Sequence, residues 1–328
     1  MKNTIIGYQA SHEQFKPSEL LKYVTLAEKA GFGAINSSDH FHPWTRQQGQ
    51  SGFAFAWLGA AMQATSIPFG SVCAPGQRYH PAIVAQAIAT LAEMFPQRFW
   101  TALGSGEALN ESITGDKWPV KQERNARLLE CADIIRRLLK GEMVTHHGRV
   151  VVEGARLYTL PPEMPLLMGA AVTKETAAWV GSWADGLITV HQPIEQLKEV
   201  VNAFRDNGGK NKPLYLKVQL SFAKTDEEAL NGAHDQWRSN IFSSTVLGDM
   251  WQVEQFDMLG QFVQREELHG MVHISADIKK HIEWINRYIK IGFDRIILHN
   301  VNRDQLYFIE TFGKKVLPEL NGHVEAKY

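Results

Sequence analysis

The chain alternates short apolar runs with segments in which apolar residues recur at helical spacing. The run 5–10 precedes a segment in which Leu20, Val24 and Ala27 share one face, and Gly31 ends that helix. The same alternation predicts eight strands, over 5–10, 34–40, 69–75, 99–106, 165–171, 185–190, 213–223 and 294–300. Eight strands alternating with helices are typical of an α/β protein whose parallel sheet closes into a (β/α)8 TIM barrel.

Two stretches account for the length of the chain beyond that of a minimal barrel. Residues 144–160 have the pattern of a hairpin. In the long segment 226–270, the pattern does not determine the order of helices and strands. We therefore expect one barrel domain over 1–328 with insertions near 144–160 and 226–270. A doubly wound open sheet is the alternative, but no GxGxxG follows the first strand, which weakens it.

Composition narrows the class of protein. Lys and Arg total 34 and Asp and Glu total 35, so no basic excess exists to neutralise nucleic-acid phosphates. The two cysteines, Cys73 and Cys131, form no disulfide framework or zinc ribbon. The amino-terminal residues lack the features of a secretory signal, and no apolar run is long enough to span a membrane. These features predict a soluble cytoplasmic enzyme.

The active site of a barrel lies at the carboxyl ends of its strands. Asp39 and His40 end the second predicted strand, where a carboxylate beside an imidazole suits general acid–base catalysis. Glu107 follows Gly-Ser-Gly after the fourth strand. The glycines let the backbone approach a ligand closely, so that the carboxyl group of Glu107 can act as a second acid. The alternatives are a capping Asp39 with a hydrogen-bonded His40, and a Glu107 that only favours a helix amino terminus.

Other candidates are weaker. His40 and His42 have the spacing of a metal pair, but no further ligands stand at the later strand ends, so we expect no metal. Cys73 has no base adjacent in sequence and is expected to pack as a small apolar residue. Trp44 lies in a loop where it can stack on a flat ring, whereas Trp284 falls on a helix face and is expected in the core.

Four blocks of sequence together resemble the bacterial luciferase-like superfamily of flavin-dependent barrels. They are IGYQASHEQFKPSEL, SSDHFHPW, RYHPAIVAQAIATL and GSGEALNE. The likeness runs through nearly the whole chain and is greatest to the branch that uses the deazaflavin coenzyme F420, typified by F420-dependent glucose-6-phosphate dehydrogenase. That branch implies an oxidoreductase that binds a small-molecule substrate and forms a homodimer.

The resemblance also implies roles for single residues. His40 would be the active-site base, Glu107 a proton donor or acceptor, and Trp44 a group that stabilises the reacting centre. Asp39 would hydrogen-bond the cofactor ring. The remaining positions that would contact the cofactor are Ser71, Val72, Cys73, Ser105, Asn110, Val172 and Thr173. At 71–73 the family often bulges through a non-proline cis peptide bond, which is rare and costly.

The chain departs from that branch at its substrate and phosphate sites. His191 and Gln192 stand where the sugar-phosphate dehydrogenases have a lysine, and Met271 aligns with their arginine. Glucose 6-phosphate is therefore not the expected substrate. Val172 and Thr173 replace the Gly-Gly that approaches the cofactor phosphate, although backbone amides at a helix start can still bind it.

We therefore predict hydride transfer between bound F420 or FMN and a small organic substrate. The sequence does not separate the two cofactors. The alternatives are an FMN-dependent monooxygenase that uses oxygen, a zinc hydrolase and a non-catalytic flavin-binding protein. The presence of both His40 and Glu107 argues against a non-catalytic flavin-binding protein, because binding alone needs no proton relay.

Overall fold

Eight parallel strands close into a barrel in the computed structural model, which describes residues 4–321. The strands are β1 (Ile5–Ala10), β2 (Ala34–Ser37), β3 (Phe69–Cys73), β4 (Phe99–Leu103), β7 (Leu167–Ala170), β8 (Leu187–Val190), β9 (Leu214–Ser221) and β11 (Arg295–Asn300). They are hydrogen-bonded in the order β9-β11-β1-β2-β3-β4-β7-β8, and β8 pairs with β9 again. The predicted barrel is confirmed, and this second pairing excludes the open sheet.

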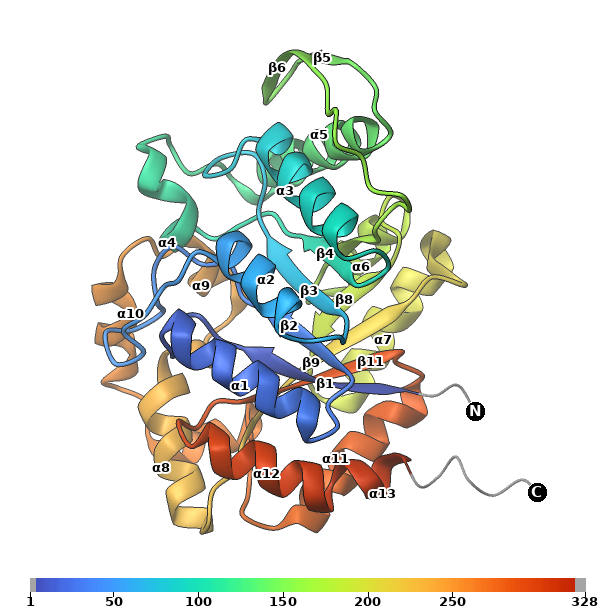
Figure 1. Ribbon diagram of the computed structural model, residues 1–328. Helices are drawn as coiled ribbons and strands as arrows, with labels where there is room; N and C mark the ends of the chain where they lie inside the picture. Colours follow the sequence, from blue (N-terminus) through green and yellow to red (C-terminus); the bar gives the residue numbers. More distant parts are fainter. Residues whose placement is uncertain (1–3, 322–328) are drawn as a thin grey trace, which may run out of the picture.

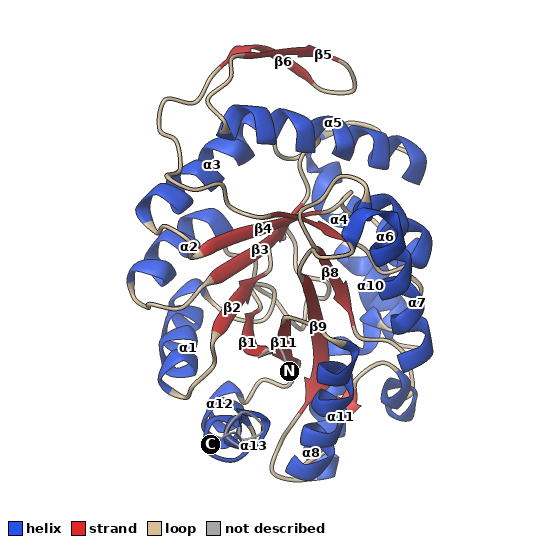
Figure 2. Ribbon diagram, turned by 90° about the vertical axis from the view of Figure 1, so that its right-hand side faces the viewer, coloured by secondary structure: helices blue, strands red, loops and turns tan. Residues whose placement is uncertain are grey.

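Helices cover the outside of the barrel (Figures 1 and 2). They include α1 (Pro17–Lys29), α2 (Ala54–Gln63), α3 (Pro81–Met94), α5 (Lys121–Leu139), α6 (Lys174–Gly181), α7 (Ile194–Phe204), α8 (Asp226–Trp237), α11 (Ile278–Ile291), α12 (Gln305–Lys315) and α13 (Leu317–Asn321). Their apolar faces and the outer faces of the strands form the main core. Burial of this apolar area is the dominant stabilising contribution.

A smaller apolar cluster fills the inside of the barrel. It contains Trp100, Ala102, Met168, Ile188 and Tyr215, with the Trp100 and Tyr215 rings in edge contact at 4.8 Å. The neighbouring strand leaves room for the indole through a glycine, because a Cβ at Gly70 would lie 1.9 Å from the Trp100 ring. The interior is thus packed, and only the mouth of the barrel is free for chemistry.

Both predicted insertions lie outside the ring of strands. The hairpin of β5 (Val144–His147) and β6 (Val151–Ala155) is confirmed and projects from the barrel (Figure 1). Segment 226–270 contains α8, α9 (Ser244–Asp249), α10 (Val253–Gly260) and a short 3-10 turn at 265–270. The two-residue strand β10 (His273–Ile274) follows it and pairs with β9.

Five strands end earlier than predicted, and the change matters most for three of them. The strands β2, β3 and β4 stop at Ser37, Cys73 and Leu103, and the residues after them form loops at the barrel mouth. The expected cis peptide at 71–73 is wrong, since every peptide bond in the described residues is trans. Residues 71–73 instead continue the regular ladder with 101–103 on β4, which a trans backbone satisfies.

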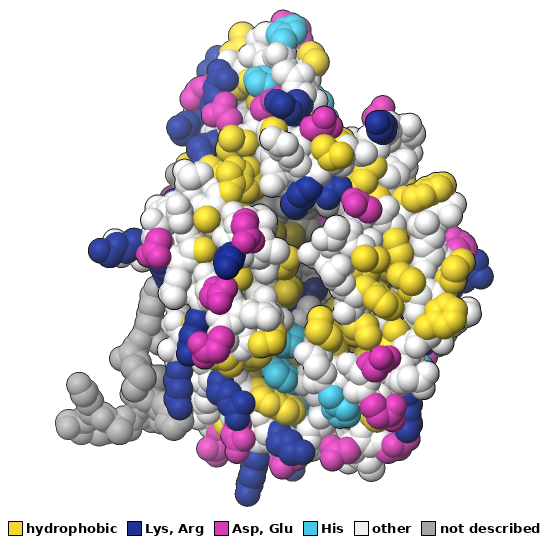
Figure 3. Space-filling model, turned by 180° about the vertical axis from the view of Figure 1, so that it is seen from behind, with side chains coloured by type: hydrophobic (Ala, Val, Ile, Leu, Met, Phe, Trp, Pro, Cys, Tyr) yellow, Lys and Arg dark blue, Asp and Glu magenta, His cyan; other side chains and the backbone are white. Residues whose placement is uncertain are grey.

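The surface carries charges of both signs. On the face in Figure 3, Lys and Arg side chains are interspersed with Asp and Glu side chains. This distribution matches the balanced composition of 34 basic and 35 acidic residues. Within residues 4–321, no helix combines the length and the apolar character needed to cross a membrane.

Candidate active site

His40 lies between two carboxylates that come from different strand ends. Its Nδ1 is 2.6 Å from Oε1 of Glu13, which follows β1, and its Nε2 is 3.7 Å from Oε2 of Glu107, which follows β4. The three residues meet because the carboxyl ends of parallel strands share one end of the barrel. His40 and Glu107 were predicted from the sequence, whereas Glu13 was not.

Glu13 is a buried carboxylate with a complete set of partners. Its Oε2 accepts hydrogen bonds from the hydroxyls of Ser11 at 2.7 Å and Ser38 at 2.8 Å. Burial alone would raise the pKa of Glu13, but the charge and contact of His40 and the Ser11 hydrogen bond hold it well below its usual range. Glu13 is therefore ionised and fixed in orientation.

The environment of His40 favours its protonated form. Burial alone would lower the pKa of His40, but the charge and contact of Glu13, followed by the charge of Glu107, raise it. The imidazole also meets the ring of Trp44 edge-on, with centroids 5.1 Å apart, and Trp44 packs on Phe256 of α10 at 5.2 Å. The imidazole is thus held on three sides, by Glu13, Glu107 and Trp44.

Asp39 does not act as the partner of His40. Its carboxylate accepts hydrogen bonds from Nη2 of Arg78 at 3.1 Å and from the hydroxyl of Tyr79 at 3.0 Å. Burial raises the pKa of Asp39, although the Arg78 charge and the Tyr79 hydrogen bond oppose the shift. The direct pairing of Asp39 with His40 expected from their adjacency is not found, because Glu13 occupies that place.

Asn110 joins the two loops that carry the candidate acid and base. Its Oδ1 accepts from the backbone N–H of Phe41 at 2.8 Å and of His42 at 3.1 Å. Its Nδ2 donates to Oε2 of Glu107 at 3.3 Å. Asn110 is 2% exposed, so in this structure it positions His40 and Glu107 from α4 (Ala108–Glu111).

His40 and His42, which have the spacing of a metal pair, do not belong to a metal-binding cluster in the described part of the chain. Nδ1 of His42 lies 2.8 Å from the carbonyl oxygen of Leu109, which holds the ring away from His40. Residues 4–321 contain no group of three or more His, Cys, Asp or Glu side chains arranged to hold a metal ion.

The end of β3 supplies a buried wall rather than a nucleophile. Cys73 is buried, and burial raises the pKa of its thiol far above neutrality. Ser71 is fully buried, and its hydroxyl has no hydrogen-bond partner among residues 4–321. Val72 packs against the apolar cluster inside the barrel. The small residues Gly104 and Ala170 continue this wall, since a Cβ at Gly104 would still be 3.9 Å from that of Ala170.

Cationic and helix-terminal groups lie around that wall. Nζ of Lys121 donates to the hydroxyl of Ser105 at 2.6 Å. Thr173 caps α6 by accepting from the backbone N–H of Thr176, and Val172 before it is 37% exposed. Small side chains for a flat ring, with an ammonium group and a helix amino terminus beside them, fit a flavin or deazaflavin with an anionic tail.

Two charged residues at the mouth were missed in the sequence. Glu13 stands three residues after β1, so the rule that selected His40 and Glu107 also covers it. Lys217 lies within β9, and burial lowers its pKa while the charges of Glu13 and Glu107 raise it. No local signal marks Lys217, because it resembles any surface lysine until the barrel closes around it.

Comparison with known proteins gives consistent relatives. A family model described as luciferase-like monooxygenase matches residues 4–297. An F420-dependent glucose-6-phosphate dehydrogenase from Microbacterium testaceum (strain StLB037) is 33% identical over 326 residues, which cover 96% of this chain and 96% of the relative.

Two solved structures extend the comparison. An F420-dependent secondary alcohol dehydrogenase in complex with an F420-acetone adduct superposes with a TM-score of 0.89 and 29% identity, covering 98% of this chain and 99% of that one. A riboflavin lyase with modified FMN superposes with a TM-score of 0.75 at 15% identity, covering 99% of this chain and 93% of that one. The second similarity shows the fold alone.

Proposed function

Since the chain belongs to the luciferase-like monooxygenase family and is a flavin- or F420-dependent oxidoreductase, we propose that it moves hydride between bound F420 and an alcohol–ketone pair. One observation carries this proposal: His40 is held between Glu13 and Glu107 at the barrel mouth. A proton relay of this kind is what oxidation of a hydroxyl-bearing carbon needs. F420 is favoured over FMN by the relatives of 33% and 29% identity, both named for F420.

The chemistry divides between cofactor and protein. A deazaflavin bound beside the small residues at the end of β3 would supply the acceptor for the hydride, that is, the carbon-bound hydrogen with both electrons of its bond. His40 accepts the hydroxyl proton at Nε2, the nitrogen that faces Glu107, as the carbonyl group forms. Glu13 keeps the other nitrogen fixed at 2.6 Å and stabilises the positive charge that develops on the ring. In the reverse direction the protonated His40 returns that proton to the alkoxide oxygen.

Glucose 6-phosphate is not the proposed substrate, although the curated relative is named for it. Protein sites bind a phosphate dianion with cationic or donor groups. Here His191 follows β8 where a lysine was expected, and burial lowers the pKa of His191 to about 4, so its ring is uncharged at neutral pH. Met271 is 45% exposed and brings no charge. Millimolar glucose 6-phosphate should neither reduce the cofactor nor compete with an alcohol.

A monooxygenase is the second candidate, because the family model is described as luciferase-like monooxygenase. FMN, the other cofactor predicted from the sequence, would serve it. The two functions differ in cofactor and in oxygen use. Purified protein should be titrated with F420 and with FMN, and absorbance should be followed while simple secondary alcohols are added without oxygen. Anaerobic loss of oxidised F420 that His40→Ala abolishes supports the proposal. Binding of FMN alone, with turnover only in the presence of oxygen, would favour the second candidate.

A cytoplasmic location and assembly as a homodimer accompany this proposal. Both remain predictions from the sequence and from the resemblance. Gel filtration of the purified protein would check the dimer.

A further inference from the structure

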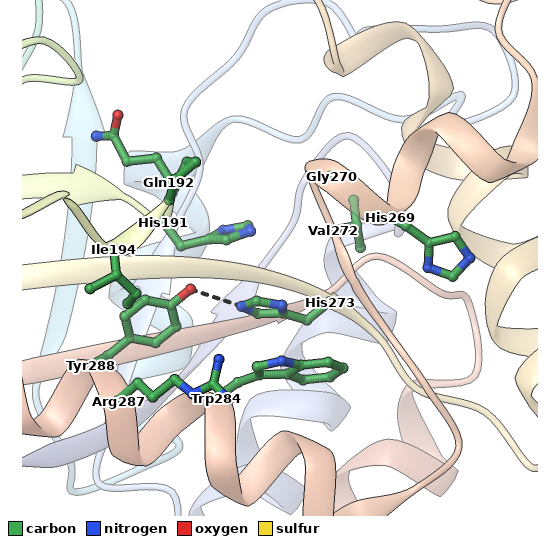
Figure 4. A pocket seen from close by; sticks show the side chains of 11 residues that line it. His191, Gln192, Ile194, His269, Gly270, Val272, His273, Trp284, Arg287 and Tyr288 are labelled. Atoms are coloured by element: carbon green, nitrogen blue, oxygen red, sulfur yellow. Dashed lines mark hydrogen bonds between the residues drawn. The ribbon is translucent and has the colours of Figure 1, made fainter. Parts of the chain in front are cut away.

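A second cavity lies at the same end of the barrel, between the end of β8 and α11. It has a volume of about 160 Å³. Its wall is formed by aromatic and imidazole rings, with one guanidinium group at the edge (Figure 4). The lining residues used below are His191, His273, Trp284, Arg287 and Tyr288. Trp284, expected in the core, is only half-buried and faces this cavity.

The rings are fixed in place. The imidazole of His273 stacks on Trp284 with centroids 4.4 Å apart and an interplanar angle of 10°. Its Nε2 lies 2.8 Å from the hydroxyl of Tyr288. The ring of His191 is 4.8 Å from that of His273, and its Nδ1 lies 2.8 Å from Oε1 of Gln219. The cavity therefore has flat, preorganised walls.

The two half-buried imidazole rings of this cavity carry no charge. Burial lowers the pKa of His191 to about 4 and that of His273 to about 3. Both imidazoles are therefore uncharged at pH 7. The lining contains no carboxylate, and its arginine, Arg287, is exposed to solvent. Such a pocket favours an uncharged flat group over a phosphate.

The cavity and His40 face the same barrel mouth. Gln219, which holds His191, is the register partner of His299 on β11. Nε2 of His299 lies 2.9 Å from Oε1 of Gln14, the residue after Glu13. Buried side chains thus connect the cavity to the segment that carries Glu13, and both places lie at the carboxyl ends of strands at one end of the barrel.

We propose that this cavity binds an uncharged ring of the substrate, so that the substrate class is a secondary alcohol bearing an aromatic or alicyclic ring, or the matching ketone. The inference rests on the proposed function and deepens it. The size agrees, since an apolar cavity of about 150 Å³ is known to accept benzene. The substrate ring would lie against the stacked pair of Trp284 and His273, and Arg287 would remain in solvent.

The test compares ring-bearing and ring-free ligands in parent and Trp284→Ala protein loaded with F420. For 1-phenylethanol the variant should raise KM at least about tenfold, whereas kcat/KM for 2-propanol should stay within about twofold. The substrate without a ring also reports that the variant is folded. Trp284→Phe should restore most of the affinity for 1-phenylethanol. Equal changes for both alcohols would overturn the proposal, and so would competition by glucose 6-phosphate that Arg287→Ala removes.

A binding measurement separates this proposal from the proposed function. Acetophenone and acetone are titrated calorimetrically into protein loaded with oxidised F420, which cannot reduce them. Tighter binding of acetophenone that Trp284→Ala abolishes supports the ring site, even if no alcohol ever reduces the cofactor. Equal binding of the two ketones in parent protein would overturn the ring site while leaving hydride transfer intact.

Discussion

Histidines in two regions of one barrel mouth have pKa values shifted in opposite directions. His40 is partly buried, and Glu13 and Glu107 raise its pKa. His191 and His273 are also partly buried, yet burial lowers their pKa values to about 4 and 3, because no carboxylate within residues 4–321 contacts them. Burial therefore does not decide the charge of a histidine by itself. The presence of an ionised partner does, and it separates a proton-transfer region from a neutral binding region.

The largest expected effect comes from removing the base. His40→Ala should lower turnover by about 10²–10⁴-fold, the usual contribution of general acid–base catalysis. F420 affinity should change little, because the imidazole contacts Glu13, Glu107 and Trp44 rather than the wall of small residues. Steady-state kinetics and an absorbance titration check the two statements. Turnover within a few-fold of the parent would remove His40 from the relay.

A smaller loss is expected at the second carboxylate. Glu107 lies 3.7 Å from His40, and 37% of its side chain is exposed, so its interaction is weaker than that of Glu13. Glu107→Gln keeps the shape and removes the charge, and we expect turnover to fall by about tenfold. Asn110 can still donate to the amide oxygen, which keeps the loop in place. A larger loss than in His40→Ala would reverse the order of the two residues.

Asp39 should affect binding more than turnover. Asp39→Ala leaves Arg78 and Tyr79 without their shared acceptor, and it removes the group that we expect to hydrogen-bond the cofactor. F420 binding should weaken by about 1–3 kcal/mol, the cost of an unpaired polar group. Asp39→Asn is the matched control that keeps the size of the side chain. An unchanged Kd in Asp39→Ala would exclude Asp39 from the cofactor site.

Because His191 and His273 are uncharged in the folded protein, we expect the fold to lose stability at acidic pH. His191 and His273 have pKa values lowered from about 6.5, so the unfolded chain binds more protons than the folded protein below that pH. The free energy of unfolding should fall as pH drops from about 6.5 toward 4. His191→Gln with His273→Gln should flatten this slope in urea titrations, whereas His80→Gln, which changes an exposed residue, should not. An unchanged slope would show that the two rings are not kept neutral by burial.

The fold was accessible from sequence because apolar periodicity records which faces are buried. All eight strands were found, and the largest errors lie at carboxyl ends, as at 34–40 against Ala34–Ser37. There the backbone N–H of Ser38 still donates to Ala10 at the end of β1, but the Ser38 hydroxyl donates to Glu13. The Asp39 carboxylate accepts from Arg78 and Tyr79, which lie in a loop. Local pattern does not reveal such partners.

The site was accessible only in part, for a related reason. The rule of strand ends located His40 and Glu107, but the contact between Glu13 and His40 joins residues 27 positions apart and exists only once β1 and β2 pair. Adjacency in sequence favoured Asp39 as the partner of His40. In the structure Asp39 instead pairs with Arg78 at 3.1 Å, a residue 39 positions away.

The central claim is that Glu13 sets the basicity of His40 for proton transfer. The most direct test is the pH dependence of kcat/KM for alcohol oxidation in the parent and in Glu13→Gln. Oxidation needs uncharged His40, so activity rises with pH through the pKa of His40. Loss of the Glu13 charge should lower that pKa, move the rise to lower pH and reduce the plateau. Glu130→Gln, which alters the His146 pair on the hairpin, should leave the profile unchanged. A rise at the same pH in Glu13→Gln and parent would contradict the account.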